Sequence, residues 1–504
     1  MRTMKRLAAP IGALVVAGLC LAGSPAMAAQ TARTAAPAAV TGAQQTYLVL
    51  YNGNSVSSSS LAAVTALGGT VVNTFPQIGV AVVSSNRADF GSALKGKDKN
   101  VAGAAATARL GVQVHDDAVG TTADAAPQAA AADLTGLQWD MDQIKAPQAH
   151  AINPGSANVV VGDIDTGLDW SHPNLAPNVD FSRSVSCVGG VPNQDRAAWM
   201  DDNGHGTHTA GTIAAASTGS GIVGVAPGVK LAGIKAGNAD GYFFPEAVVC
   251  SFMWAATHGI QVTNNSYFAD PWLYNCKNDP DQRAIWEAER RAIKFAQNNG
   301  VVVVSAEGNE SDDLAHPTMD STSPDTDPAP VPREITNACA VVPVEVPGVI
   351  GVTANGYNMV KSYYSSYGVG VADVVAPGGD RRFQIPPSTG NGRVLSTWPI
   401  DLMDETCAVP GPAAGYCWAQ GTSMASPHAA GVAALIASTG VTNANKIASM
   451  LQQQADPIAC PTDMSNFVSF PSTQSGAPQV CQGGIGNNGF NGAGQVNALT
   501  AVGG

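Results

Sequence analysis

Three short segments of the sequence contain residues that could act together on a carbonyl group. Asp165 closes the apolar run NVVVGDID, His205 lies in the glycine-rich stretch DDNGHGTH, and Ser423 lies in GTSMASPHAAG. A serine hydroxyl is a weak nucleophile until a histidine takes its proton, and a carboxylate can hold that histidine in the correct tautomer. The chain order Asp, His, Ser is one of the orders in which this triad occurs. We therefore predict nucleophilic catalysis by Asp165, His205 and Ser423.

A proline falls inside the helix that is predicted to begin near Ser423. GTSMASPHAAG is typical of the first turns of a helix, yet Pro427 stands four residues after Ser423. Proline inside a helix removes a backbone hydrogen bond and costs about 3 kcal/mol. A helix start also directs unpaired N–H groups and the positive end of the helix dipole at a reacting carbonyl. We expect the fixed pose of Ser423 to outweigh this local cost.

Strands and helices alternate around the three segments. Residues 281–299 are typical of a helix with one apolar face and an Asn-Gly stop. The apolar runs typical of buried strands are NVVVGDID, VKLAGIK, IQVTNNS, GVVVVSA, GVIGVTA and VADVVA. This alternation predicts an α/β fold with a doubly wound, mostly parallel sheet in residues 135–504. Active sites of such sheets lie at the carboxyl ends of the strands, where Asp165 is expected.

The start of the chain is typical of an export signal. Residues 1–28 combine a positive start, an apolar run and small residues in an A-x-A arrangement, which predicts cleavage after Ala28. A lipoprotein would need a small residue before Cys20, but Leu19 is there. No other stretch approaches the roughly 18 continuous apolar residues of a membrane helix. We expect a secreted, extracellular protein with no membrane association after signal removal.

Residues 46–114 have a pattern of their own. The pattern predicts, in order, a strand, a helix, two strands, a helix and a strand, with the last strand near 108–114. This is the order of a small α+β, ferredoxin-like domain. Residues 115–134 are rich in alanine and low in complexity, so we expect an exposed linker that a protease can cut.

Composition limits the partners and the redox state. The net charge of −13 argues against nucleic acid or an anionic membrane as the main partner. Eight of the nine cysteines follow the predicted signal, and an even number in an exported protein predicts disulfides. Nearness in sequence favours Cys407 with Cys417 and Cys460 with Cys481.

The sequence resembles the subtilisin family of serine proteases, the subtilases. DTG at 165–167, HGTH at 205–208 and GTSMASPH at 421–428 match the three signature segments of that family. AGQVNALTAV resembles the end of its catalytic domain, so no further domain is expected. The resemblance implies a secreted serine endopeptidase that hydrolyses peptide bonds through an acyl-enzyme intermediate. It also implies that residues 46–114 are a pro-domain that assists folding and inhibits the enzyme, which would be a self-processed, monomeric zymogen.

The resemblance assigns further residues to the site. SAEGNES at 305–311 corresponds to the Gly-Asn-Glu segment of the family, which makes Asn309 the side-chain donor to the oxyanion. Polypeptide substrates are expected to bind as an extended strand between two edge segments. The substrate-binding residues expected in these segments and in the Asn309 loop are Gly241, Tyr242, Ser266, Tyr267, Phe268, Glu307 and Gly308.

Two departures from the family pattern leave substrate preference open. Tyr267 and Phe268 stand where the family has Leu-Gly-Gly, and they either reshape the pocket or serve as core packing. Glu307 stands where alanine is common. It is either an acidic pocket wall that favours Lys or Arg substrates, or part of a solvated acidic loop. General digestion and the processing of particular secreted partners both remain open.

The predicted chemistry requires no cofactor and no metal. The strong calcium site of the family uses an Asp in His-Pro-Asp-Leu, but this chain has Asn174 there, so that site is expected to be weakened or missing. Calcium elsewhere remains open. A zinc peptidase using His205 and His208 would lack the H-E-x-x-H arrangement, and the resemblance makes His208 structural. An inactive relative kept for binding is disfavoured, because the triad and Asn309 are all present.

Overall fold

The structure is a computed structural model that describes residues 41–107, 132–325, 329–403, 407, 409 and 415–504. Three predictions fall wholly or mainly outside these residues. They are the signal peptide, the strand at 108–114 and most of the linker at 115–134. Residues Val40–Gly504 form one compact unit.

The N-terminal module, residues 41–107, is a four-stranded antiparallel sheet with two helices. Its elements are β1 (Thr41–Tyr51), α1 (Ser58–Ala66), β2 (Thr70–Phe75), β3 (Val80–Arg87), α2 (Phe90–Lys97) and β4 (Val101–Ala106). The strand order β2-β3-β1-β4 is that of a ferredoxin-like sheet, as the element order predicts. The last strand lies earlier than expected. Its sequence, VAGAAA, alternates in burial but consists of small residues, so it carries little apolar signal.

One face of this sheet packs on α7 (Pro280–Asn298), the helix predicted at 281–299. Arg291 of α7 donates hydrogen bonds to the carbonyl oxygens of Tyr51 at 3.0 Å, Gly53 at 3.1 Å and Ile78 at 3.1 Å. Between them the sheet and helix bury a set of apolar side chains that includes Leu48, Leu50, Val80, Val82, Ala288 and Ala292. The module is therefore held by both apolar packing and a partly buried arginine that donates to three backbone carbonyls.

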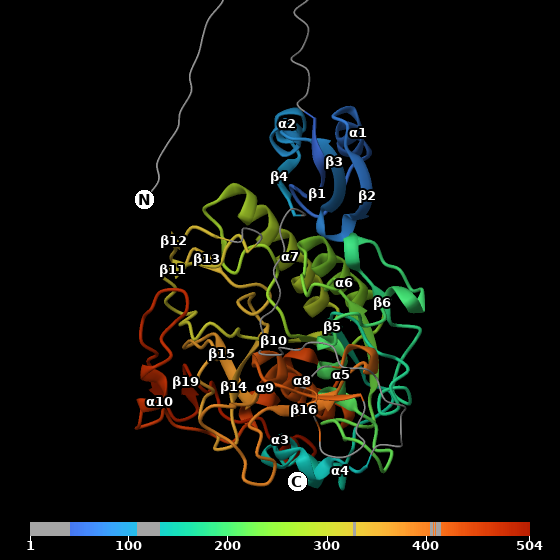
Figure 1. Ribbon diagram of the computed structural model, residues 1–504. Helices are drawn as coiled ribbons and strands as arrows, with labels where there is room; N and C mark the ends of the chain where they lie inside the picture. The colour runs from blue at the N-terminus through green and yellow to red at the C-terminus, as the bar shows by residue number, and fades with distance from the viewer. Residues whose placement is uncertain (1–40, 108–131, 326–328, 404–406, 408, 410–414) are drawn as a thin grey trace, which may run out of the picture. The chain divides into compact units, whose positions relative to one another are not determined.

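The rest of the chain is built on a seven-stranded parallel sheet (Figure 1). Its order is β15-β14-β10-β8-β5-β7-β6, and every neighbouring pair is parallel. The strands are β5 (Val160–Asp165), β6 (Val185–Ser186), β7 (Lys230–Lys235), β8 (Val262–Asn265), β10 (Val302–Ala306), β14 (Ile350–Asn355) and β15 (Ala372–Pro377). Each of the six apolar runs identified in the sequence forms one of these strands. The predicted doubly wound α/β fold is confirmed.

Helices cover both faces of the sheet. On one side lie α5 (His205–Ala214) and α8 (Thr422–Ser438), and on the other α6 (Pro245–Thr257) and α7. Side chains alternate along β5, so Val161 packs toward α5 and α8 while Val160 packs toward α6. By the same alternation Asp165 shares the face of Val161, where α5 and α8 begin.

Short elements and disulfides complete the fold. The remaining elements are α3 (Trp139–Gln143), α4 (Ala146–His150), α9 (Ala444–Gln453), α10 (Ser465–Val468), α11 (Ala498–Ala501), β9 (Asn275–Cys276), β11 (Met319–Asp320), β12 (Arg333–Glu334), β13 (Cys339–Ala340), β16 (Val394–Thr397), β17 (Tyr416–Ala419), β18 (Gly483–Gly484) and β19 (Asn487–Asn488). The disulfides are Cys187–Cys250, Cys276–Cys339, Cys407–Cys417 and Cys460–Cys481. The last two are the pairs favoured by nearness in sequence.

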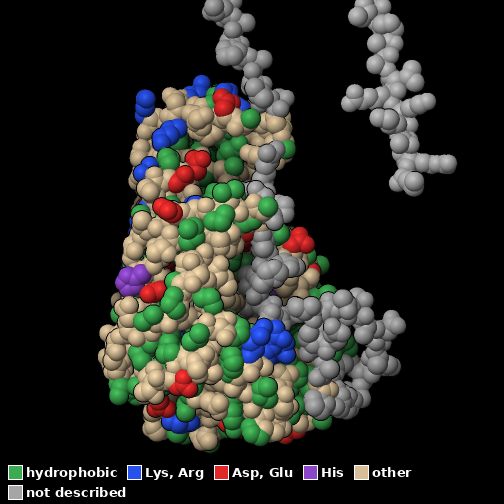
Figure 2. All heavy atoms as spheres, turned by 60° about the vertical axis from the view of Figure 1, so that its left-hand side comes forward, with side chains coloured by type: hydrophobic (Ala, Val, Ile, Leu, Met, Phe, Trp, Pro, Cys, Tyr) green, Lys and Arg blue, Asp and Glu red, His purple; other side chains and the backbone are tan. Residues whose placement is uncertain are grey.

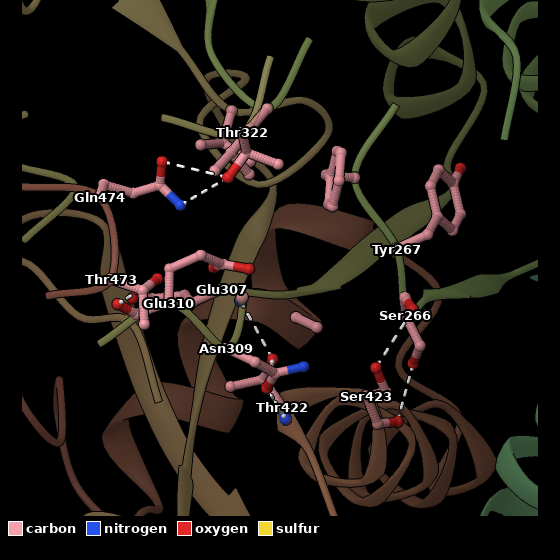
Figure 3. Close-up of a pocket in the computed structure, with 15 residues that line it drawn as sticks. Ser266, Tyr267, Glu307, Asn309, Glu310, Thr322, Thr422, Ser423, Thr473 and Gln474 are labelled. Carbon is pink, nitrogen blue, oxygen red and sulfur yellow. Dashed lines mark hydrogen bonds between the residues drawn. The ribbon is translucent and has the colours of Figure 1, made fainter. Parts of the chain in front are cut away.

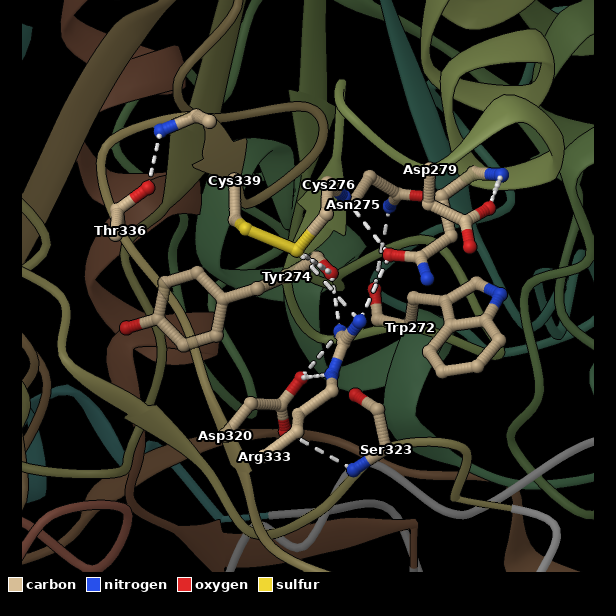
Figure 4. The surroundings of a disulfide bond; sticks show 12 residues. Trp272, Tyr274, Asn275, Cys276, Asp279, Asp320, Ser323, Arg333, Thr336 and Cys339 are labelled. Atoms are coloured by element: carbon tan, nitrogen blue, oxygen red, sulfur yellow. Dashed lines mark hydrogen bonds and ion pairs between the residues drawn. A yellow bond between two sulfur atoms is a disulfide. The ribbon is translucent and has the colours of Figure 1, made fainter.

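The Cys276–Cys339 disulfide joins the paired strands β9 and β13 (Figure 4). Arg333 lies beside it and donates to the Tyr274 carbonyl at 2.6 Å and to Asp320 at 2.7 Å. The disulfide and the arginine therefore fasten together loops that are distant in sequence.

Replacing both Cys276 and Cys339 by serine should lower the free energy of unfolding by about 4 kcal/mol. The bridge spans 63 residues, and chain-entropy arguments assign about this stabilisation to a loop of that length. The matched control is the Cys407→Ser, Cys417→Ser pair, which spans 10 residues and should cost about 3 kcal/mol. Urea unfolding of the three proteins measures both losses. A larger loss in the control would contradict the loop-length argument.

Candidate active site

Asp165 and His205 form a hydrogen-bonded pair at the carboxyl end of β5. His205 is the first residue of α5, and its Nδ1 lies 2.7 Å from Oδ1 of the fully buried Asp165. Helix α5 can begin this close to the DTG turn because residue 206 is glycine. A Cβ at that position would lie only 2.2 Å from the carbonyl oxygen of Gly167. The DTG turn and the HGTH segment thus pack backbone against backbone, which sets the histidine ring against the carboxylate.

Ser423 is the second residue of α8, a helix whose residues 422–437 are all buried. Pro427 has no N–H, so the Ser423 carbonyl lacks its usual helical donor. Ser266, just after β8, supplies that donor, because its hydroxyl bonds to the Ser423 carbonyl at 2.9 Å. In return, the Ser423 hydroxyl lies 3.3 Å from the Ser266 carbonyl. The proline therefore frees a backbone acceptor that ties the helix start to the neighbouring strand end.

A buried polar network beneath these residues was not predicted from the sequence. Asp163 accepts hydrogen bonds from Thr209 of α5 at 2.8 Å and from Asn264 of β8 at 2.9 Å. Asn264 in turn accepts from Ser426 of α8 at 2.6 Å. Burial and the neighbouring charge of Asp165 raise the pKa of Asp163 well above its usual range. The available signal was the spacing in GDID, which places both aspartates on one face of a buried strand.

Asn309 follows β10 and is held by the start of α8. Its Oδ1 accepts from the Thr422 N–H at 2.9 Å and from the Thr422 hydroxyl at 3.1 Å. Because a backbone N–H can only donate, the atom facing it is the amide oxygen, and the amide nitrogen occupies the opposite side. In Figure 3 that nitrogen points to the side on which Ser423 lies. The side chain is thus oriented to donate toward the serine.

A pocket of about 320 Å³ opens beside Ser423 (Figure 3). One wall is the segment Ser266–Phe268 and the other is Ala306–Glu310. Of the predicted substrate-binding residues, Ser266, Tyr267, Phe268, Glu307 and Gly308 line this pocket. Gly241 and Tyr242 are absent from its lining and form a separate turn, in which the Gly241 N–H donates to the Asn238 carbonyl at 3.0 Å. The sequence did not indicate five further lining residues, which are Leu273, Thr322, Val341, Thr473 and Gln474.

Comparison with known proteins settles the family. The sequence pattern of the Subtilase family matches residues 156–477. The chain is a subtilase. Its relatives include subtilisin BL of Lederbergia lenta, 31% identical over 300 residues that cover 60% of this chain and 84% of that protein. M-protease of Shouchella clausii is 29% identical over 366 residues, which cover 73% of this chain and 70% of that protein. The chain is accordingly a serine endopeptidase that acts on polypeptides.

A solved structure supports the fold. The epidermin leader peptide processing serine protease of Staphylococcus aureus is similar to this subtilase with a TM-score of 0.65 and 21% identity. The match covers 91% of this chain and 98% of that chain. At this identity the likeness concerns the fold alone. Within the described residues, no helix of the subtilase has the length and apolar character needed to cross a membrane.

The ring of Tyr267 is part of the core rather than of the pocket. It stacks on Phe243 with ring centroids 4.2 Å apart, and its hydroxyl donates to Asn265 at 3.2 Å. Figure 3 shows the ring turned away from Asn309 and Glu307. Of the two interpretations of this residue, the structure favours core packing, so Tyr267 lines the pocket through its backbone.

His208 is enclosed and is not arranged as a metal ligand. Its Nε2 lies 3.2 Å from the Cys417 carbonyl, and burial lowers its pKa to about 3, which keeps the ring neutral. Among the residues that the structure describes, no three or more His, Cys, Asp or Glu side chains are grouped to hold a metal ion.

The loop that corresponds to the calcium site of the family is held by an amide. Nδ2 of Asn174 donates to the Ala216 carbonyl at 3.2 Å, the Thr218 hydroxyl at 2.9 Å and the Ser220 carbonyl at 3.1 Å. These are the kinds of oxygen that a calcium ion would bind. An N–H donor already stands among them, so the residues present do not fit a cation there.

Proposed function

We propose that this subtilase hydrolyses peptide bonds with Ser423 as nucleophile, His205 as general base and acid, and Asp165 as the residue that orients the imidazole. The observation that carries the proposal is the 2.7 Å bond between His205 Nδ1 and the buried Asp165. It fixes the tautomer in which Nε2 can accept a proton. The serine stands at the start of α8, which packs against α5, the helix that begins with His205.

The reaction then follows from the roles of these groups. His205 Nε2 takes the Ser423 hydroxyl proton as Oγ attacks the substrate carbonyl, and the positive imidazole is stabilised by Asp165. The same nitrogen gives the proton to the leaving amine, which leaves an acyl-serine. Water, deprotonated by His205, releases the acid and restores Ser423. Each step transfers only protons or the acyl group, so the proposed reaction requires no cofactor.

Asn309 supports the charge that develops on the carbonyl oxygen. Its amide is held by Thr422, so its donor is oriented before substrate arrives. Ser423 is the second residue of α8, so the favourable end of the helix dipole also acts near the developing charge.

The remaining proposals concern the export, the maturation and the oligomeric state of the protein. Residues 1–28 would direct export, and residues 46–114 would act as a pro-domain that the enzyme removes after folding. The packing of the N-terminal module on α7 and the three bonds from Arg291 support the second proposal. On the face shown in Figure 2, hydrophobic side chains are interspersed with polar ones, which supports a monomer.

A fluorophosphonate reagent tests the proposed nucleophile directly. It should attach to Ser423 of the mature wild-type protein and abolish peptide cleavage in proportion to the label, while a zinc chelator leaves cleavage unchanged. Peptide mass spectrometry locates the adduct. Cleavage that resists the reagent, or an adduct at another serine, would contradict the assignment of Ser423.

A further inference from the structure

We infer that the loop between β15 and β16, residues 378–393, holds a docking groove for an acidic stretch of the polypeptide substrate. This cavity, the arginine groove, has a volume of about 370 Å³ and is lined by Arg381, Arg382, Ile385 and residues 390–393, the last of which is Arg393. The acidic stretch lies in the half of the substrate that leaves as the amine. The inference rests on the proposed function, because it takes Ser423 as the point of attack.

A second cavity, of about 240 Å³, joins the arginine groove to the catalytic centre. It shares Arg381 and Arg382 with the groove, and Asn309 and Thr473 with the pocket beside Ser423. The pocket and the second cavity share no other lining residue, so they approach Asn309 from different directions. An extended substrate runs both ways from the oxyanion donor, so one half lies along the pocket and the other half is led to the groove.

The two halves of a substrate need different surroundings. The acyl half stays bonded to Ser423 until water releases it, which suits the pocket between Ser266–Phe268 and Ala306–Glu310. The leaving half must depart after the first step, which suits a groove whose arginines Arg381 and Arg382 are exposed. The groove is therefore assigned to the leaving half.

The backbone of the loop is held at both ends of the groove. Asp380 is buried, accepts from the Arg382 N–H at 3.0 Å and donates its own N–H to the Gly392 carbonyl at 2.8 Å. The Arg381 N–H donates at 2.9 Å to the side-chain oxygen of Gln420, which lies between β17 and α8. The groove is thus fastened to the segment that leads into the helix of the proposed nucleophile.

The side chain of Arg382 is oriented by two aromatic rings. Its guanidinium carbon lies 5.3 Å from the ring centroid of Tyr363 and 5.1 Å from that of Phe470. The residue is exposed, and among the described residues no carboxylate forms an ion pair with it. Contact with ring faces leaves the N–H groups at the edge of a guanidinium able to donate to a carboxylate. Arg382 is therefore placed to bind an acidic side chain.

The charge that lines the arginine groove and the second cavity has one sign. All charged residues of both linings are arginines. The carboxylate of Asp380 is turned into the loop, where Nε2 of Gln384 donates to it at 3.0 Å. Glu307, which the sequence left open as part of a solvated acidic loop, is only 1% exposed and lines neither cavity. The chain as a whole carries a net charge of −13, so an attraction for acidic peptides can only be local.

Apolar side chains stand beside the arginines. Ile385 lines the groove and is 49% exposed, and the neighbouring Phe383 is 38% exposed. A polypeptide that combines acidic and apolar residues can contact both kinds of side chain at once. Together with the cavity that continues to Asn309, this makes the substrate itself the occupant of the groove.

The test uses the mature enzyme and quenched peptides that share one cleavage site. They carry a pair of glutamates at the second and third, the third and fourth, or the fourth and fifth residue after the cleaved bond, and matched peptides carry glutamines there. At the best position we expect the Glu peptide to exceed its Gln match in kcat/KM by about 3- to 10-fold at low salt, the size of one or two exposed ion pairs. The gain should lie in KM, because a docking contact stabilises ground state and transition state alike, and it should shrink at high salt.

Variants locate the origin of the preference. Arg382→Gln should lower the Glu-to-Gln ratio of kcat/KM at least about 2-fold, and Arg382→Glu should lower it further. The ratio does not depend on how much of a variant is folded, so a partial loss of stability leaves it readable. The matched control is Arg196→Gln, an exposed arginine that also lies over aromatic rings, at 4.0 Å from Phe181 and 5.8 Å from Trp170, but lines neither cavity. It should leave the ratio unchanged.

Three results would overturn the inference and leave the proposed function standing. They are equal kcat/KM for Glu and Gln peptides at every position, a ratio that falls equally in Arg196→Gln, and a gain that arises only from glutamates placed before the cleaved bond. In each case the Gln peptides are still cleaved. If no peptide is cleaved and the fluorophosphonate does not label Ser423, the proposed function fails, and the inference fails with it.

Discussion

Replacing Ser423 by alanine should lower kcat for peptide hydrolysis about 10⁶-fold, the order of magnitude known for the corresponding loss in subtilisin. The alanine side chain has no atom to form the acyl-enzyme, and His205 and Asp165 then have no proton to move. Residual activity above that of water would come from Asn309 and substrate binding alone. KM should change little, because the hydroxyl belongs to the reacting group rather than to the pocket walls.

The measurement compares this variant with Ser438→Ala, which makes the same change at the far end of α8. Only Ser423→Ala should lose activity and remain uncut between residues 46–114 and the catalytic domain when it is produced alone. Mass spectrometry of the purified chain reports that cut. If the Ser423→Ala protein is still cut when it is produced without wild-type enzyme, another protease performs the processing.

Replacing Asn309 by alanine should lower kcat about 10²- to 10³-fold while KM stays close to the wild-type value. The physical reason is that the amide donor acts on the oxyanion, whose charge develops in the transition state and is small in the bound substrate. This range was measured on a subtilisin, a member of the same family. The effect corresponds to about 2.7–4 kcal/mol of barrier.

A second variant separates donation from structural support. Asn309→Asp keeps an oxygen that can accept from Thr422 but has no N–H group to donate. If donation is the role of Asn309, the aspartate variant should lose at least as much kcat as the alanine variant. Recovery of activity in Asn309→Asp would instead assign the residue to holding the start of α8.

The fold was largely predictable because its strands carry strong and regular signals. The apolar runs that became β5, β8 and β10 are buried on both faces, and parallel sheets require such runs. The misplaced element was β4, a strand of small residues in which Gly103 and Ala105 are buried and the other alanines are half-buried. Burial there is decided by the close approach of α7, since a Cβ on Gly103 would lie 2.6 Å from Ala284, and no local pattern reports such a contact.

The site was predictable where short motifs carry the chemistry. Asp165 and His205 are bonded as their motifs predict, and Asn309 is oriented by Thr422. Their roles remain predictions until the variants are measured. Part of the pocket lining could not be predicted, because Leu273 and Gln474 come from loops that are far apart in sequence and meet only in the folded chain.

The topology that builds the site also bears on when the enzyme becomes active during folding. Ser266 and Ser423 are bonded across 157 residues of chain, and their neighbours β5, β8 and β10 pair only through long crossovers. Folds dominated by such distant contacts form slowly, because the entropy cost of loop closure must be met before the contacts can stabilise the chain. No early folding intermediate that lacks the centre of the sheet can hold the serine, the histidine and the asparagine together. Slow closure of the sheet therefore delays the onset of proteolysis, which gives a newly made chain time to fold before any copy can cleave another.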